Sequence, residues 1–222
     1  TWDSCLAPLL QRQYPGGSTA AMNEAKSYAY GGAILQDMGY YPLGSTLFTN
    51  LTHYVRAGDF VRNLLRQAHS RNEYAFALGA LAHYAADNTG HPEGTNLIIA
   101  TIYPDLKAKF GPVVTYEQSR VRHNELEFSF DVVQVAAGIY RTQEYHKAIG
   151  FRVSKPVMER AFRQTYGLEM KRVFLNVNAS VAMFRFAVNQ LLPAAARAAW
   201  YHKHDEIREL SPRARRGDSL YH

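Results

Sequence analysis

The chain has 222 residues, of which 47% are hydrophobic and 20% charged, and this length requires no more than one folded domain. Its longest apolar stretch, residues 181–200, is interrupted by Arg185, Asn189, Pro193 and Arg197, which excludes an integral membrane protein. The net charge of +6 favours anionic partners, namely phospholipid surfaces, nucleic acid or phosphorylated substrates.

Helical patterning dominates the chain, and no alternating run is long enough to predict a sheet. The stretch 72–87 is apolar nearly all round, as expected of a buried central helix. We therefore expect an all-α fold, with one multi-helix catalytic domain over residues 1–206 and a basic, flexible tail over residues 207–222. The predicted helices are 18–29, 59–68, 72–87, 115–138, 141–148, one from Ser154, 168–191 and 193–206.

Two pairs of histidine and carboxylate residues are spaced one helical turn apart. His83 and Asp87 lie on the central predicted helix, and His123 and Glu127 lie on another. Each pair therefore projects from one face of its helix, within reach of a common ion. His91 follows Asp87 by four residues, but Gly90 and Pro92 beside it predict that the helix has ended and that His91 lies on a loop.

Two further candidates lie upstream, Asp37 next to a turn and His53 at the entry to a helix. Taken singly, each of these residues has an ordinary explanation as a cap, a turn residue or a buried, hydrogen-bonded histidine. Together, four histidines and three carboxylates fall in otherwise apolar or turn-flanked segments. Imidazole and carboxylate are ligands that zinc prefers, so the combination predicts a metal centre.

The order of these residues resembles the zinc-dependent phospholipases C, which share an all-helical superfamily with single-strand-specific nucleases. The resemblance covers about residues 25–130. The family motifs are an Asp in G-x-x-x-x-D, a His in T-H-Y/F, a His and an Asp in H-Y-x-x-D, and a later H-x-x-x-E. The matching residues are Gly32 with Asp37, Thr52 with His53, His83 and Tyr84 with Asp87, and His123 with Glu127.

The resemblance also implies a set of metal ligands. By position, one zinc is held by Asp37, His53, His83 and Asp87, and a second by His91, His123 and Glu127.

Two features depart from the family pattern. The family places the last histidine of its motif six residues after the Asp, whereas His91 follows Asp87 by four. The family binds a third zinc through an N-terminal Trp and a nearby His. Trp2 has no such histidine behind it, so a third zinc would need residues upstream of Thr1.

The resemblance implies a phospholipase C that hydrolyses a phospholipid to diacylglycerol and a phosphorylated headgroup, with Asp37 as catalytic base. Glu127 favours a phospholipase, because the nucleases usually place Asp there. Two alternatives stay open: a single-strand nuclease or nucleotidase on the same scaffold, and a non-catalytic helical module with a degenerate metal site. Family members are exported, so we expect a periplasmic or secreted protein in peripheral contact with a membrane surface.

Overall fold

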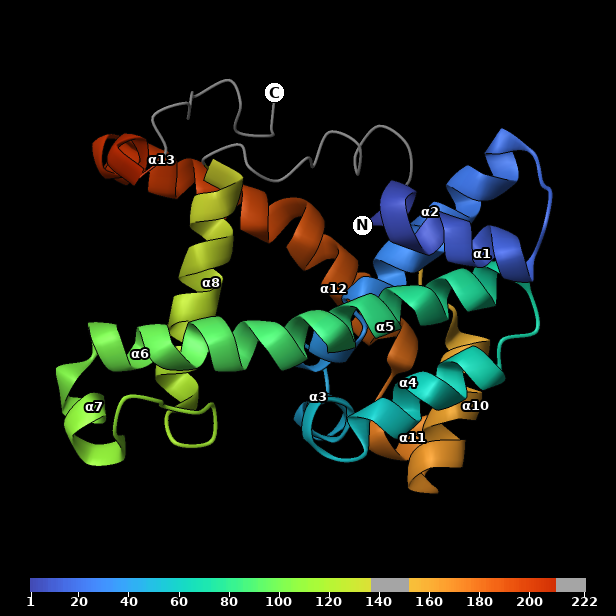
Figure 1. Ribbon diagram of the computed structural model, residues 1–222, viewed down its shortest axis with the longest axis horizontal. Coiled ribbons are helices and arrows are strands. Elements are labelled where there is room, and N and C mark those ends of the chain that lie inside the picture. The colour runs from blue at the N-terminus through green and yellow to red at the C-terminus, as the bar shows by residue number, and fades with distance from the viewer. Residues whose placement is uncertain (137–151, 211–222) are drawn as a thin grey trace. The chain divides into compact units, whose positions relative to one another are not determined.

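The computed structural model describes residues 1–136 and 152–210, and these ranges contain helices and no strand (Figure 1). The prediction of an all-α fold is confirmed. The chain divides into two compact units. The first unit comprises Thr1–Ala85 and Glu144–Ala187, and the second comprises Ala86–Gln143 and Val188–His222. The predicted helix 141–148 lies outside the described residues.

The first unit contains most of the helices. Ser18 caps α2 by accepting a hydrogen bond from the backbone N–H of Ala21, which agrees with the helix predicted to begin at residue 18. The helix α5 begins in this unit and continues into the second. The elements are η1 (Trp2–Leu6), α1 (Ala7–Gln13), α2 (Thr19–Ala33), η2 (Gln36–Tyr40), α3 (Thr46–Tyr54), α4 (Ala57–Arg66), α5 (Arg71–Gly90), α10 (Lys155–Tyr166), α11 (Met170–Val173) and α12 (Val177–Phe186).

The second unit is built around the packing of α8 on α13. A smaller apolar core forms where Ile99 and Val114 are fully buried. The elements are η3 (His91–Thr95), α6 (Asn96–Ile102), α7 (Pro104–Phe110), α8 (Arg120–Ala136), η4 (Ala187–Leu191) and α13 (Leu192–Leu210). Because α13 runs to Leu210, only residues 211–222 of the predicted tail lie outside the described part of the chain.

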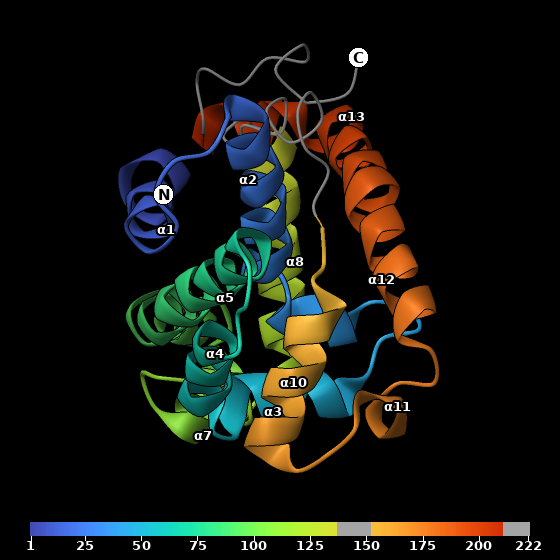
Figure 2. The same cartoon turned by 90° about the vertical axis from the view of Figure 1, so that its right-hand side faces the viewer.

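Aromatic side chains hold the lower part of the first unit together, where α3, α4 and α10 lie side by side (Figure 2). The ring of Phe48 packs against Phe162 at 5.5 Å and against Phe174 at 5.0 Å between centroids. Phe60 contacts both Phe48 and Phe162. Trp2 is also a core residue, since it is buried with Leu6 and Leu10 against α2 and α5.

Several helix boundaries differ from the predictions. Gly90 keeps a right-handed helical conformation, with φ of −64°, so the chain passes from α5 directly into the π-type turn η3. His91 is therefore helical, and the prediction that it lies on a loop is wrong. Pro92 is accommodated because a π-type turn interrupts the regular α-helical hydrogen-bond register. The predicted helix 168–191 is broken before Asn176, whose side chain caps α12.

Helices α2 and α5 cross at two glycines. A methyl group added to Gly32 would overlap the carbonyl oxygen of Phe76, and one added to Gly79 would overlap that of Ala29. The two backbones therefore approach more closely than any side chain would allow. This contact sets the position of α2 relative to the next turn of α5, which carries His83.

We expect Gly79→Ala to lower the free energy of unfolding by about 1–3 kcal/mol or more, because a rigid backbone carbonyl must move to make room. Gly90→Ala in the same helix is the matched control. A methyl group at Gly90 meets nothing within 4 Å, so this variant should gain about 0.5–1 kcal/mol from helix propensity. Urea unfolding of both variants measures the difference, and equal stabilities would contradict the close packing.

None of the helices in the described part of the chain combines the length and the apolar character needed to span a bilayer.

Candidate metal centre

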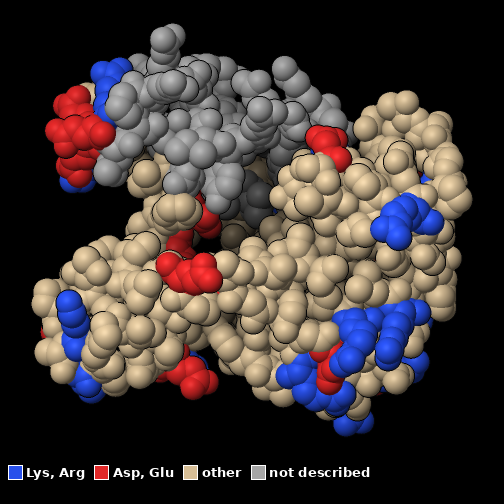
Figure 3. Space-filling model, viewed as in Figure 1, with Lys and Arg blue, Asp and Glu red and all other residues tan. Residues whose placement is uncertain are grey.

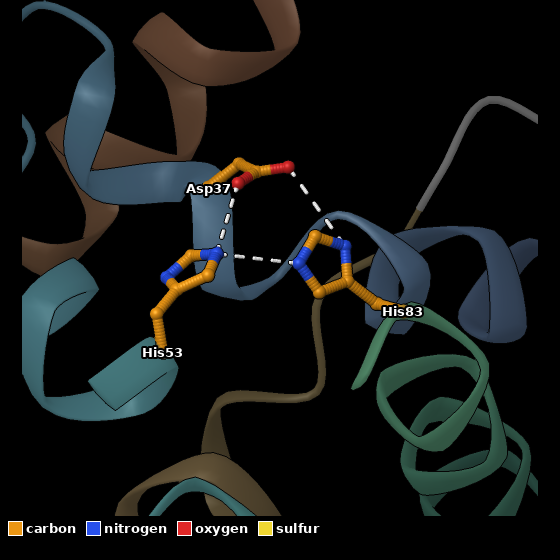
Figure 4. A group of neighbouring side chains, drawn as sticks. All are labelled: Asp37, His53 and His83. Carbon is orange, nitrogen blue, oxygen red and sulfur yellow. Dashed lines mark hydrogen bonds and ion pairs between the residues drawn. The ribbon is translucent and has the colours of Figure 1, made fainter. Parts of the chain in front are cut away.

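The first unit brings together Asp37, His53 and His83, which come from three separate elements (Figure 4). Asp37 lies in η2, His53 in the last turn of α3 and His83 in α5. Their ligand atoms all lie within 4.8 Å of one another. The Oδ1 atom of Asp37 is 3.3 Å from Nε2 of His53, and its Oδ2 atom is 3.8 Å from Nδ1 of His83.

Backbone carbonyl groups fix the orientation of both imidazoles. The Nδ1–H of His53 donates to the carbonyl oxygen of Thr49 at 2.9 Å, and that of His83 donates to the carbonyl oxygen of Ala33, also at 2.9 Å. A carbonyl oxygen can only accept, so each Nδ1 must carry a proton. In the neutral rings, Nε2 is then the acceptor atom.

The two Nε2 atoms face each other at 3.3 Å. Two lone pairs at this distance repel, and the carboxylate of Asp37 adds negative charge beside them. The arrangement becomes favourable only when a proton or a cation lies between these acceptors. Imidazoles held by a second hydrogen bond to a carbonyl are also typical of zinc ligands, because that bond fixes the tautomer and ring direction.

Thr49 connects the two ligand-bearing elements η2 and α3. Its hydroxyl group accepts a hydrogen bond from the N–H of Gly39 at 2.9 Å and donates one to the carbonyl oxygen of Gln36 at 2.7 Å. Its own carbonyl oxygen holds the ring of His53. Gln36 in turn donates to the carbonyl oxygen of Ala80 on α5. This buried network positions Asp37 relative to both histidines.

The second unit brings together His91, His123 and Glu127, whose ligand atoms also lie within 4.8 Å of one another. The Oε1 atom of Glu127 is 3.6 Å from Nδ1 of His91 and 3.7 Å from Nδ1 of His123. The rings of His91 and His123 stack, with 6.0 Å between centroids and 15° between planes. His91 thus reaches this group from η3 and not from a loop.

Two buried atoms of the second group have no hydrogen-bond partner among the described residues: Nδ1 of His123 and Oε1 of Glu127. The Nε2–H of His123 donates to the carbonyl oxygen of Val114 at 2.8 Å, so its Nδ1 is an acceptor in the neutral ring. Leaving a buried acceptor unsatisfied costs about 1–3 kcal/mol. A cation would satisfy both atoms, and the imidazole and carboxylate ligands suit zinc.

These two groups lie within a region that also matches a known family. The family model for zinc dependent phospholipase C matches residues 6–176, which include both groups. The chain belongs to the zinc-dependent phospholipase C family. No curated protein and no solved structure shows significant similarity to the chain.

Six of the seven predicted ligands of this family member are thus gathered into two groups. Asp87, the seventh, lies on α5 one turn after His83, and within the described residues neither group of three includes it. The assignment of all seven residues as zinc ligands stays a prediction. Of the neighbouring tyrosines, the rings of Tyr40 and Tyr54 lie 5.9 Å and 5.7 Å from that of His53.

Sequence reasoning missed the groups that orient the ligands. The carbonyl groups of Ala33, Thr49 and Val114 give no sequence signal, because every residue has one. Thr49 lies one helical turn before His53, and that spacing is the only feature of the sequence that could have identified it.

In the metal-free protein, the pKa values of His53 and His123 are both raised above the ordinary value of 6.5. Burial is the largest single influence and lowers each pKa. The carboxylate beside each ring outweighs it, Asp37 for His53 and Glu127 for His123, together with a backbone carbonyl group. Protonated imidazoles therefore stabilise the metal-free fold below pH 6.5, and this contribution is lost as the pH rises through the raised pKa values.

Zinc reverses this dependence, because it binds the neutral imidazole and competes with protons. We expect the Tm of the chelator-treated protein to fall, and that of the zinc-loaded protein to rise, as the pH increases from about 6 to 8. His53→Gln should reduce both slopes. Thermal denaturation followed by circular dichroism measures them. A metal-free protein that becomes more stable across this range would contradict the pKa directions.

Proposed function

We propose that this family member is a zinc-dependent phospholipase C that hydrolyses a phospholipid to diacylglycerol and a phosphorylated headgroup. The main support comes from the two groups of histidine and carboxylate side chains. In the first group the Nε2 atoms of two histidines face each other, and in the second a histidine nitrogen and a carboxylate oxygen are buried without a hydrogen-bond partner among the described residues. Both arrangements suit a bound cation. Membership of the family supports the reaction class. We also propose export of the protein, in line with the family resemblance.

In this proposal two zinc ions are bound. Asp37, His53 and His83 hold the first, with Asp87 as a further ligand, and the second is held by His91, His123 and Glu127. Zinc polarises phosphoryl oxygens as a Lewis acid and makes water acidic enough to act as a nucleophile near neutral pH. The carbonyl groups of Thr49 and Ala33 orient the two imidazoles, so that the Nε2 atoms of both histidines would be available to the first ion.

Asp37 has a second role in this proposal, as the catalytic base. Its side chain is 38% exposed, so a water molecule can reach a carboxylate oxygen that also lies beside the two imidazoles. Asp37 accepts a proton from the attacking water while the bond between phosphorus and the glycerol oxygen breaks. The glycerol oxygen takes up a proton and leaves as diacylglycerol.

The test is an assay of purified, zinc-loaded protein on phosphatidylcholine vesicles and, in parallel, on single-stranded DNA. We expect diacylglycerol and phosphocholine from the vesicles, and loss of this activity on removal of the metal with a chelator. Cleavage of DNA alone would favour the nuclease alternative. Absence of both activities, with fewer than two tightly bound zinc ions per chain, would identify a non-catalytic module.

A further inference from the structure

Leu43 is exposed although its backbone conformation disfavours a leucine. Its φ angle is +63° and its side chain is 61% exposed. It occupies the third position of a turn closed by a hydrogen bond from the N–H of Gly44 to the carbonyl oxygen of Tyr41, where glycine or asparagine is preferred. The hydroxyl group of Ser180 on α12 donates to the carbonyl oxygen of Leu43 and holds the turn in place. Packing within the first unit does not explain a leucine here.

Two more leucines are exposed close to this turn. Leu47, in the first turn of α3, is 52% exposed, and Leu175, between α11 and α12, is fully exposed. The residues next to them in sequence, Phe48 and Phe174, pack ring to ring at 5.0 Å. This contact joins the segment that carries Leu175 to the start of α3. We call Leu43, Leu47 and Leu175 the leucine surface.

Positive charge borders the leucine surface. Lys171 and Arg172 lie on α11, just before Leu175, and both are exposed. Neither forms an ion pair with the described part of the chain. Elsewhere on this unit, Figure 3 shows Lys and Arg side chains together with some Asp and Glu over the region of α4 and α10, where Arg56 and Arg62 pair with Asp59. Exposed leucines beside exposed cationic side chains are the combination that binds an anionic lipid interface.

The leucine surface belongs to the same unit as the first metal-binding group, and two of its residues are close to that group in sequence. Leu43 follows Asp37 by six residues, and Leu47 precedes His53 by six on the same helix. The elements η2 and α3 are packed together and joined by the hydroxyl group of Thr49. A lipid layer that contacts the leucine surface would therefore lie against the unit that holds Asp37 and His53.

We propose that Leu43, Leu47 and Leu175 enter the interface of a phospholipid bilayer, while Lys171 and Arg172 bind its anionic headgroups. The inference rests on the proposed function, in that the substrate is part of this bilayer. Charge favours a bilayer over a second copy of the chain, because a symmetric dimer through this surface would bring the same positive charges together.

The experiment measures vesicle binding separately from catalysis. Zinc-loaded protein is mixed with vesicles of phosphonate analogues of phosphatidylcholine and phosphatidylserine, which resist hydrolysis, and is then sedimented. The combined variant Leu43→Asn, Leu47→Gln and Leu175→Gln should lower the vesicle partition coefficient about tenfold to a hundredfold. Lys171→Glu with Arg172→Glu should lower it about tenfold and reduce its dependence on salt.

The helix α1 offers matched controls, since Leu9→Gln and Arg12→Glu change exposed residues of the same types away from this surface. Both should partition like the wild type. Asn tolerates positive φ, so Leu43→Asn should not lower the Tm. Hydrolysis of a short-chain, water-soluble phosphatidylcholine should be unchanged in the leucine variant.

Each other outcome is decisive. A wild type that does not partition, or a leucine variant that partitions equally, would overturn the proposal. The wild type could instead be a dimer that binds no vesicles, with the leucine variant a monomer. This result would assign the surface to contact with a second copy of the chain and would also overturn the proposal. A protein that binds vesicles through these residues but hydrolyses no phospholipid would uphold the docking surface and refute the proposed function.

Discussion

Replacing His83 with alanine is expected to abolish zinc binding at the first group and, with it, phospholipid hydrolysis. Loss of an outer hydrogen-bond partner of a zinc ligand costs about 10–100-fold in affinity, and loss of the ligand itself should cost more. The variant also leaves Asp37 and His53 without the imidazole that completes their group. Metal analysis of the purified variant, together with its rate on phosphatidylcholine vesicles, measures the effect. The Tm of the zinc-treated variant should fall as well, because bound zinc stabilises the folded state.

His202→Ala is the control for this variant. His202 is exposed on α13 and belongs to neither group within the described residues. Its replacement should leave metal content and hydrolysis intact. A normal zinc content in His83→Ala would refute the assignment of His83 as a ligand, whatever the activity of the variant.

Asp37→Asn separates ligation from proton transfer. In the proposed function His53, His83 and Asp87 remain to hold the ion, so we expect this variant to keep zinc. An amide accepts protons poorly, so turnover should fall by about 10² to 10⁴, the usual contribution of a positioned general base. The measurement is kcat at saturating phospholipid on protein of known metal content.

Other results for Asp37→Asn have different meanings. If metal and activity fall in proportion and added zinc restores part of the rate, Asp37 is a ligand only. Full metal occupancy with near-normal turnover would contradict both roles and leave Asp37 as a residue of the η2 turn.

The sequence by itself determined the features that depend on local spacing. The periodic apolar residues predicted an all-helical fold, and the described residues confirm it. The one-turn spacing of His123 and Glu127 placed both on one face of α8, where the structure finds them in the same group. Within a helix such pairs are neighbours wherever the helix packs, so the pattern needs no tertiary information.

Only the tertiary structure decided how distant residues meet. Asp37, His53 and His83 come from three elements, and they converge because Gly32 and Gly79 let α2 and α5 touch while Thr49 ties η2 to α3. The direction of each imidazole depends on a backbone carbonyl group. Because every residue has one, the sequence does not show which carbonyl group binds the ring. The rule that glycine and proline end a helix failed at Gly90 and Pro92. A π-type turn continues the helix there and places His91 beside His123. Close backbone approach and long-range hydrogen bonds fixed this geometry, and both depend on which elements meet in the folded chain.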